Sequence, residues 1–281
     1  MTGTDQRTPK LTVVFVLWGD AYGAAHVNAL VRDVGAHASI PVGYICFTDR
    51  DRPDLHRLAR QVPIPSPFED PAFRRGARTK LCQFAAGALD PSRPALFLDL
   101  DTMVTGDVAR LAEAIHPDGL TILPATFRPA YRVLHAVSRA GLGPMTGRVN
   151  SSVMGYWPGA MADLAPQFLA DVDAGLTDRF MIADDRWLSR RAADRIRLWS
   201  RHHVTKFADA FGHPLRRRAT GPLVALTFPG NDLGPDALLA APDGARLKDR
   251  RGRRLIWDDI HTDGWATRIR DHWRAVDDAT A

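Results

Sequence analysis

The chain has 281 residues, of which 45% are hydrophobic, so it can bury a sizeable core but is too short for several large domains. Its two cysteines, Cys46 and Cys82, exclude a disulfide framework and predict a reduced, cytoplasmic protein. The polar start, Met1 to Lys10, lacks the apolar core of a signal peptide, and no later run has the length of a membrane span.

The formal net charge of +5 is unevenly distributed. From Arg186 onward, 19 lysines and arginines stand against 12 aspartates, an excess of +7, so the first two thirds are slightly acidic. The basic residues cluster at 216–218 and 248–254. Such clusters can meet phosphates or anionic lipid heads, although they are as often plain solvated surface. We expect no nucleic-acid partner and keep peripheral contact with the inner membrane face as a hypothesis.

Alternating apolar runs and turn residues predict an α/β fold. In the first third of the chain, the pattern indicates strands at 11–17, 41–47 and 94–98, helices at 24–36, 54–59 and around 81–89, and an extended crossing segment at 62–67. In the middle third, it indicates a helix at 108–115, a strand at 120–123, a helix at 131–140, a strand at 150–157 and helices after Pro158 and from Asp184. In the last third, it indicates strands at 196–199 and 223–228 and a helix from Asp263. The first strand, helix and strand predict a right-handed βαβ unit. We therefore expect one domain at 11–230, with a mostly parallel central sheet flanked by helices. A basic extension at 231–281 would pack its terminal helix on the core.

Two acids, Asp99 and Asp101, end the apolar run 94–98. On an extended backbone they project from the same face, while Leu100 points the other way. Two carboxylates in one space repel unless a cation compensates, and oxygen ligands of this kind suit Mg²⁺ or Mn²⁺. Ligands gather at the carboxyl ends of strands in open α/β sheets. The pair is therefore interpreted as half of a metal site, against the alternative of two solvated acids at a strand end.

Other strand ends and helix starts supply further candidates. Asp20 and Tyr22, after the first strand, could bind a base or ribose, although they are also common turn formers. Arg78 and Lys80 carry charges that suit a diphosphate. Surface solvation explains each of them equally well.

Three polar residues lie farther along the chain. Asn150 opens the strand at 150–157 and can both donate to and accept from a sugar hydroxyl, or form an ordinary turn. Asp184 and Asp185 precede a helix, where acids also stabilise the positive end of the helix dipole.

With these segments in order, the chain resembles nucleotide-sugar glycosyltransferases of the GT-A fold, nearest to family 8 and its uncharacterised bacterial relatives. The resemblance covers about residues 11–230 and depends on five weak motifs in the same order, namely Val14 to Tyr22, Cys46 to Asp49, Leu98 to Val104, Asn150 to Met154 and Ala183 to Leu188.

The resemblance implies a site. Asp99 and Asp101 would hold Mn²⁺ or Mg²⁺ against the donor diphosphate, which the Asp99–Leu100 stretch would contact, and Asp20 and Tyr22 would lie on the nucleoside. Asn150, Asp184 and Asp185 would line the sugar and the acceptor. Family 8 enzymes usually retain the anomeric configuration, and Asp185 stands where the family has a glutamine.

One departure affects the metal. The family places a histidine before Phe-x-Gly as a third ligand, followed by Lys-Pro for the phosphates. Here Thr227-Phe228 precedes Pro229-Gly230, with neither histidine nor lysine in register. Asp232, His213 or water would then complete the metal shell.

Two other classes of function remain open. A haloacid dehalogenase-type phosphatase also ends a strand with Asp-x-Asp, but it places Gly-Thr directly afterwards, whereas Thr102-Met103 follows here. A nucleotide- or polyanion-binding protein without transferase activity would use the basic C-terminal third and would bind in a strongly salt-dependent manner.

Overall fold

A computed structural model describes residues 10–125, 149–176, 183–211, 222–228, 233–248, 252 and 254–279. Four sequence predictions lie outside these ranges: the helix at 131–140, the basic cluster 216–218, most of the cluster 248–254, and the third metal ligands proposed at His213 and Asp232.

A seven-stranded sheet forms the centre of the molecule, in the order β3-β2-β1-β4-β7-β6-β8. Its strands are β1 Leu11–Leu17, β2 Val42–Thr48, β3 Ala59–Pro63, β4 Ala95–Leu98, β6 Leu120–Pro124, β7 Val149–Tyr156 and β8 Ile196–Leu198. Within this sheet, β7 pairs antiparallel with both β4 and β6, and the other four pairings are parallel. The expected mostly parallel sheet is confirmed.

Apolar sequence explains why the centre of this sheet is buried on both faces. All seven residues of β1 are buried. The strand pairs in parallel with β2, from Leu11 opposite Val42 to Leu17 opposite Thr48. A strand covered on both faces needs a continuous apolar run rather than alternation, and β1 has one.

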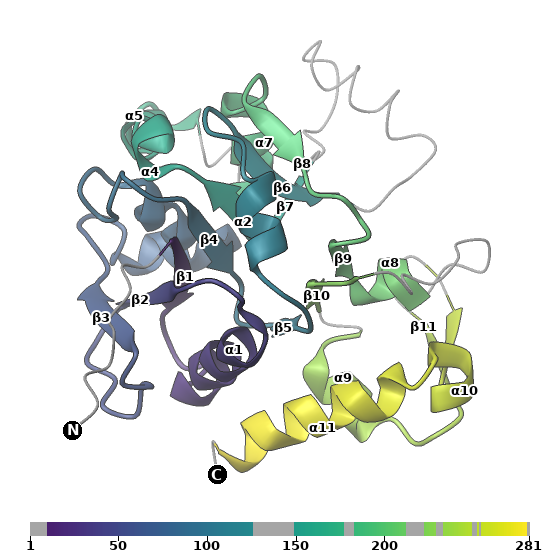
Figure 1. The fold of residues 1–281 in the computed structure, drawn as a ribbon. Helices are drawn as coiled ribbons and strands as arrows, with labels where there is room; N and C mark the ends of the chain where they lie inside the picture. The colour runs from purple at the N-terminus through teal and green to yellow at the C-terminus, as the bar shows by residue number, and fades with distance from the viewer. Residues whose placement is uncertain are drawn as a thin grey trace.

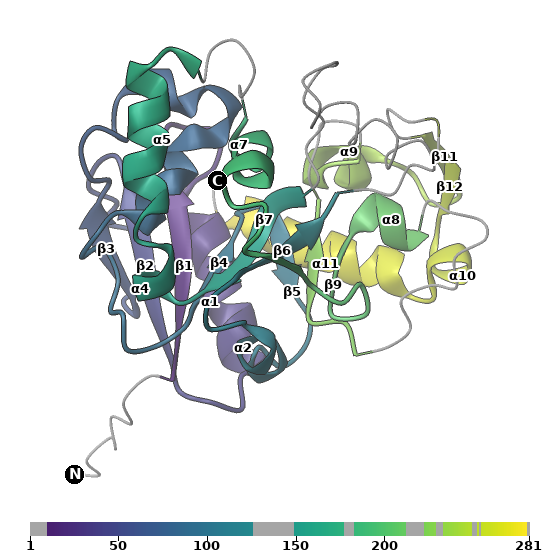
Figure 2. The same ribbon diagram turned by 90° about the horizontal axis from the view of Figure 1, so that it is seen from above.

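Helices cover the two faces of the sheet (Figures 1 and 2). One face carries α1 Ala24–His37 and α2 Ala109–Ala114, and the other carries the 3₁₀ helix η1 Pro71–Phe84 with α4 Pro158–Met161, α5 Leu164–Asp173 and α7 Asp184–Arg191. In α1 the buried residues Val27, Leu30, Val31 and Val34 follow helical spacing and pack against Leu11 and Val13 of β1. The predicted βαβ start is thus confirmed.

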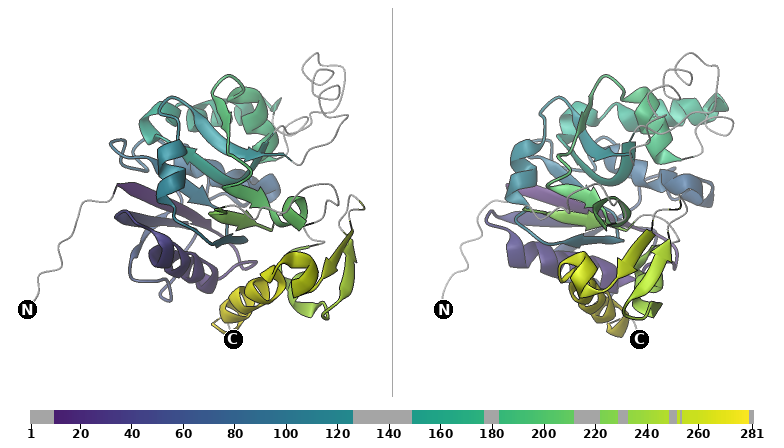
Figure 3. Two further views of the ribbon diagram at one scale, coloured as in Figure 1. Left: turned by 45° about the vertical axis from the view of Figure 1, so that its right-hand side comes forward. Right: turned by 90° about the vertical axis from the view of Figure 1, so that its right-hand side faces the viewer.

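A second, smaller sheet joins the central domain to the C-terminal part (Figure 3). It has the order β5-β10-β9, with β5 Thr102–Val104, β10 Ala225–Thr227 and β9 Val204–Lys206. Around it lie α8 Phe207–Phe211, α9 Pro235–Ala240, the hairpin β11 Ala245–Lys248 and β12 Arg254–Trp257, α10 Asp259–Thr262 and α11 Trp265–Asp278. One apolar cluster contains Leu226 and Phe228 together with Trp257 and Trp273. The terminal helix therefore packs on the core, while a division of the chain at residue 230 stays a prediction.

Three predicted elements differ in the structure, and the sequence pattern did not predict β5, β9, α8, α9, β11, β12 or α10. Residues 54–58 form turns rather than a helix, and the expected crossing segment begins as β3, which pairs in parallel with β2. An edge strand needs ladder bonds on one side only, so it tolerates Pro63 at its end. The segment predicted as a helix around 81–89 is the end of η1, which stops at Phe84. Among the described residues, none of the helices combines the length and apolar character needed to cross a membrane.

Candidate active site

The two acids of the Asp-x-Asp motif lie between both sheets. Backbone bonds fix them on either side: the Asp99 N–H donates to the Ser152 carbonyl of β7 at 2.8 Å, and the Phe228 N–H donates to the Asp101 carbonyl at 2.9 Å. Asp99 continues the β4 ladder, and Asp101 precedes β5. The pair is thus held at the carboxyl end of β4, where the sequence places it.

Asp101 is the more enclosed of the two acids. It is 8% exposed, and its Oδ1 atom is buried without a hydrogen-bond partner. Burial and the neighbouring Asp99 carboxylate raise the pKa of Asp101 well above its ordinary value. A buried oxygen without a partner is costly, which makes this atom a place where a cation would stabilise the protein.

Tyr22 lies beside the acid pair. Burial first, and then the charges of Asp101 and Asp99, raise the pKa of the Tyr22 phenol above its ordinary value. Its ring also meets the His26 ring edge-on at 5.0 Å. The role predicted for Tyr22, on the nucleoside of the donor, stays a prediction.

Lys80 occupies a different place from the one expected of a phosphate-binding cation. It is 6% exposed, and its Nζ atom donates to Asp99 Oδ2 at 2.5 Å. Burial acts to lower the pKa of Lys80, but the carboxylates of Asp99, Asp184 and Asp101 outweigh that effect and raise it. Lys80 is therefore an internal counter-ion that joins the acid pair to Asp184.

Arg78 is also engaged within the protein. Its Nε donates to the Arg75 carbonyl at 3.1 Å and its Nη2 to the Ala72 carbonyl at 2.7 Å. The chain turns back at Gly76 and Ala77, which have φ values of 66° and 59°, and this turn makes the contacts possible. These bonds assign Arg78 to stabilising η1.

The start of β7 brings polar groups beside Asp99. Asn150 is half-buried, and its Oδ1 accepts from the Ser152 N–H at 3.2 Å. Ser151 and Asp184 are each 4% exposed, and the Asp185 N–H donates to Asp184 Oδ1 at 2.7 Å. Burial raises the pKa of Asp184, Lys80 opposes that shift, and Asp185 adds to it.

Asp185 is half-buried at the first turn of α7, and its Oδ1 is buried without a hydrogen-bond partner. Burial raises the pKa of Asp185, although Arg186, Lys206 and Lys80 act to lower it. The structure thus brings Asp99, Asp101 and Asp184 together around Lys80, with Asp185 adjoining Asp184.

Asp20 is separate from this group. Its side chain is 83% exposed and pairs with Arg50. The acid that organises the end of β1 is instead Asp49, whose carboxylate accepts from the Gly19 N–H at 2.8 Å, from Arg52 at 2.9 Å and from Arg74 at 3.3 Å. Asp49 was not among the predicted site residues, although an acid at the end of β2, directly beside β1, was a signal for it.

Leu100 contributes through its backbone. Its side chain is 3% exposed in the apolar cluster that contains Leu98 and Val104, and its N–H donates to Asp99 Oδ1 at 3.2 Å. Leu100 and Asp101 form a turn after β4, so the extended backbone expected across the motif is wrong, and the turn positions the two acids.

The residues present fit a divalent cation in part. Among the described residues, Asp101 Oδ1 has no hydrogen-bond partner and Asp99 Oδ1 accepts the long Leu100 bond, so each acid has an oxygen suited to a hard cation. Within the described ranges, no three histidine, cysteine or acidic side chains gather as a complete metal site. Two protein ligands would leave further positions to the donor phosphates and to water, as is usual for Mg²⁺.

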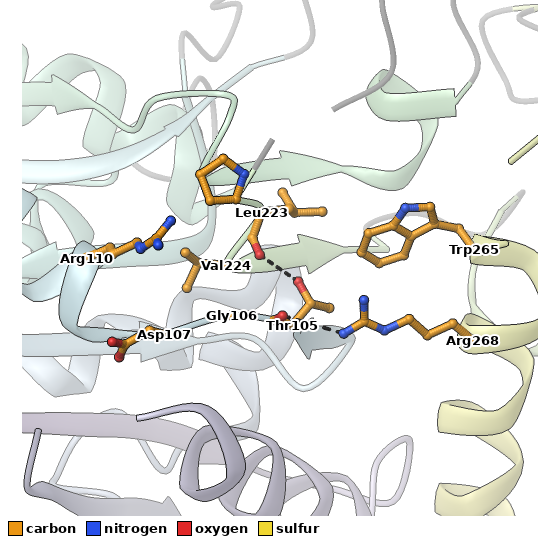
Figure 4. Close-up of a pocket in the computed structure, with 9 residues that line it drawn as sticks. Thr105, Gly106, Asp107, Arg110, Leu223, Val224, Trp265 and Arg268 are labelled. Carbon is orange, nitrogen blue, oxygen red and sulfur yellow. Dashed lines mark hydrogen bonds between the residues drawn. The ribbon is translucent and has the colours of Figure 1, made fainter. Parts of the chain in front are cut away.

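A hollow of about 240 Å³ lies elsewhere (Figure 4). Arg110, Trp265 and Arg268 line it together with Thr105 and Leu223, and Arg268 lies over the Trp265 ring at 4.8 Å. Thr105 follows the end of β5 that is remote from Asp101, so the hollow and the acid pair are at opposite ends of the small sheet. None of the predicted site residues lines this hollow.

Comparison with solved structures gives clear similarity in fold at low sequence identity. The chain is similar to the galactosyltransferase LgtC in complex with donor and acceptor sugar analogues, with a TM-score of 0.61, 14% identity, and coverage of 94% of this chain and 95% of LgtC. It is also similar to the glycosyltransferase GlyE of Streptococcus pneumoniae TIGR4, with a TM-score of 0.53, 17% identity, and coverage of 80% and 56% of the two chains. For mouse xyloside xylosyltransferase 1 the TM-score is 0.50 at 13% identity, with coverage of 79% and 97%.

Neither a protein-family model nor a curated protein sequence matches the chain. The shared feature is therefore the architecture of the fold. The chain has the GT-A fold of nucleotide-sugar glycosyltransferases, and it resembles family 8 among them.

Proposed function

We propose that the chain is a metal-dependent glycosyltransferase that moves a hexose, with retention of configuration, from a UDP-linked donor to a saccharide or lipid-linked envelope glycan. The observation that carries this proposal is the acid pair at the carboxyl end of β4 in a GT-A fold, in which Asp101 is buried and its Oδ1 has no hydrogen-bond partner among the described residues. The reaction would take place in the cytoplasm, where a basic C-terminal part would suit an acceptor at the inner membrane face.

The donor's leaving group sets the chemical demand. The bond between the anomeric carbon and the phosphate oxygen breaks, its electron pair stays on the phosphate, and the acceptor oxygen bonds to the anomeric carbon as its proton leaves. Mn²⁺ or Mg²⁺ held by Asp99 and Asp101 would neutralise the charge that develops on the diphosphate. Lys80 holds Asp99 Oδ2, which fixes the orientation of the carboxylate before the donor arrives.

The remaining polar residues suit the sugar and acceptor side. We assign Tyr22 to the nucleoside, with Asp20 at the outer edge, and Asn150, Asp184 and Asp185 to the sugar and acceptor. Asp185 adjoins Asp184 in the first turn of α7, and burial raises its pKa, so it holds a proton more readily than an exposed acid does. Because the side chain of Asp20 is exposed, we assign it a smaller role in donor binding than Tyr22.

A panel of nucleotide sugars with Mn²⁺, run beside a panel of phosphomonoesters, tests the proposed function. We expect slow release of a nucleoside diphosphate from one nucleotide sugar, loss of that release with EDTA, and loss with Asp99→Ala. Phosphate release from the monoesters alone would instead establish the phosphatase. Salt-sensitive nucleotide binding that survives EDTA and Asp99→Ala, without turnover, would establish the binding protein.

A further inference from the structure

Segments that are far apart in the sequence form the walls of the hollow beside α11 (Figure 4). Thr105 and Gly106 follow β5, Leu223 lies just before β10, and Trp265 and Arg268 come from the first turn of α11. The Thr105 hydroxyl donates to the Leu223 carbonyl at 2.9 Å. A Cβ atom at Gly106 would lie 2.7 Å from the same carbonyl oxygen, so the close approach of these two segments requires glycine. The backbone therefore fixes the floor of the hollow.

One wall presents a tryptophan and an arginine in a defined arrangement. Trp265 and Arg268 are three residues apart in α11, so they lie on the same side of the helix. The Cζ atom of Arg268 lies 4.8 Å from the centre of the Trp265 ring, and its Nη2 donates to the Thr105 carbonyl at 3.5 Å. Within the described part of the chain this is the one hydrogen bond of the Arg268 side chain. An arginine has five N–H donors, so the others can bind an anion.

A second arginine lines the hollow from a different element. Arg110 belongs to α2, is exposed, and lies across the Thr105–Gly106 segment from Arg268 in Figure 4. Its charge acts on Asp107, but its guanidinium forms no hydrogen bond to any residue that the structure describes. Two like charges that line one small hollow repel each other, and a bound anion would relieve that repulsion.

The acid beside these arginines is engaged elsewhere. Among the described residues that line the hollow, Asp107 is the only acid. Its carboxylate accepts from the Ser39 N–H at 3.0 Å, from the Ser39 hydroxyl at 2.5 Å and from the Ala109 N–H at 2.9 Å. Burial raises the pKa of Asp107, but these bonds and the charge of Arg110 outweigh that effect and lower it. The carboxylate is turned away from Trp265 (Figure 4), so positive charge is in excess in the hollow.

We propose that this hollow binds a small phosphate ester, with Arg268 and Arg110 on its phosphate and with Trp265 and Leu223 against its organic part. A planar guanidinium matches the oxygens of a phosphate and can donate two parallel hydrogen bonds to it. Pockets for drug-sized ligands have roughly 300–1,000 Å³, so a hollow of about 240 Å³ suits a smaller molecule, such as a sugar phosphate or the glycerol phosphate of a lipid headgroup. This site requires neither the acid pair nor a cation.

Titration calorimetry on the full chain in EDTA tests the site. The probes are inorganic phosphate, glucose 6-phosphate and glycerol 3-phosphate, with glucose as the uncharged control. We expect saturable binding of at least one ester, tighter than that of inorganic phosphate, and none of glucose. Arg268→Met and Arg110→Met should each weaken binding of that ester by about tenfold. Arg274→Met is the matched control, since Arg274 is an exposed arginine of α11 outside the hollow, and it should bind like the wild type.

The two esters distinguish the sources of the phosphate. Tighter binding of glucose 6-phosphate would assign a free sugar phosphate, tighter binding of glycerol 3-phosphate would assign a lipid headgroup, and either result supports the proposal. Equal affinity for inorganic phosphate and both esters would overturn it. Wild-type affinity in both arginine variants, or no binding of any phosphate by the wild type, would overturn it as well.

Two features of the design keep the result decisive. If Arg268→Met fails to fold, Arg110→Met decides, because the exposed Arg110 side chain has no hydrogen bond to lose among the described residues. EDTA and the absence of a nucleotide keep the acid pair out of the measurement. Failure of this site would therefore leave the proposed function standing.

Discussion

The neighbouring parallel strands β1 and β4 share a sequence pattern and end in opposite environments. Each is an apolar run followed by an acid, yet Asp20 after β1 has a side chain that is 83% exposed, while Asp101 after β4 is 8% exposed. The difference comes from what covers each end. The turn after β1 lies at the surface against Arg50, whereas the small sheet and Lys80 enclose the end of β4. An acid at a strand end becomes a site only where other elements bury it.

The strongest test of this difference removes the counter-ion that belongs to the buried end alone. Lys80→Met leaves the carboxylates of Asp99, Asp101 and Asp184 without their shared cation. We expect it to lower the free energy of unfolding by about 3–5 kcal/mol, as measured by urea denaturation. Arg50→Met removes the cation at the exposed end and should not change stability measurably.

A double variant checks the cause. Lys80→Met combined with Asp99→Asn removes both charges of the pair, and it should recover part of the stability that Lys80→Met alone loses. Additive losses in the double variant would contradict the role of Lys80 as an internal counter-ion.

Asp101→Asn addresses the chemistry of the buried end. We expect it to lower the rate of sugar transfer by about 100-fold or more, since it weakens a cation ligand and keeps the size of the side chain. Stability should be equal to or greater than that of the wild type, because burial disfavours the charge that this substitution removes. A rate within a factor of three of the wild type would show that Asp101 does not hold the cation.

A half-buried acid, Asp33, at the contact of α1 with α11, extends the comparison away from the sheet. Asp33 Oδ2 lies 3.3 Å from His272 Nδ1. Burial raises the pKa of Asp33 to about 6 and lowers the pKa of His272 to about 4. Burial is the largest cause of both pKa shifts. The two shifts therefore do not come from an ion pair between Asp33 and His272. His26, Arg32 and Arg268 are the other charged groups that act on this contact.

The signs of the two shifts oppose one another. The raised pKa of Asp33 gives stability that is present below pH 3.8 and is lost as the pH rises through about 6. The lowered pKa of His272 gives stability that is present above pH 6.5 and is lost as the pH falls toward 4. In Asp33→Asn the contribution of His272 therefore remains alone. We expect the free energy of unfolding of this variant to fall by about 1–2 kcal/mol as the pH is lowered from 6.5 to 4, after allowance for partial exposure.

In His272→Gln the contribution of Asp33 remains alone, so the free energy of unfolding should fall as the pH rises from 4 to 6. Thermal unfolding of both variants across this range checks the prediction. Identical pH profiles for the two variants and the wild type would contradict it.

The smallest effect is expected at the exposed end of β1. Asp20→Asn should leave the melting temperature unchanged and should change the rate of transfer by no more than about threefold, because exposed ion pairs contribute little. Loss of activity comparable to that of Asp101→Asn would place Asp20 in the donor site and would remove the contrast between the two strand ends.

Much of the fold could be predicted because local sequence determines it. The apolar runs at 11–17 and 120–123 and the Asp99–Asp101 pair lie where the pattern places them. Strand β3 was missed because the prolines of the segment 62–67 suggested a crossing segment. Pro63 is the one that belongs to β3, and an edge position tolerates it. Segment η1 was missed because the turn at Gly76 and Ala77 interrupts the helical period.

The remaining site residues depend on contacts between distant parts of the chain. The inward direction of Lys80 and the engagement of Arg78 follow from that turn in η1, and a spacing pattern does not report it. The small sheet that encloses Asp101 forms through pairing of β9 with β10 and of β10 with β5, and β5 and β10 are more than 100 residues apart in the sequence. Local motifs identify the acids, and long-range pairing decides which cations meet them.

The central claim is that Asp99 and Asp101 hold a divalent cation on which the diphosphate of the donor binds. Calorimetric titration of UDP into the wild type and Asp101→Asn, with Mn²⁺ and with EDTA, tests it directly. We predict UDP binding by the wild type in Mn²⁺ that weakens at least tenfold both in EDTA and in the variant. UDP affinity that is the same with Mn²⁺ and with EDTA, and the same in both proteins, would contradict the claim.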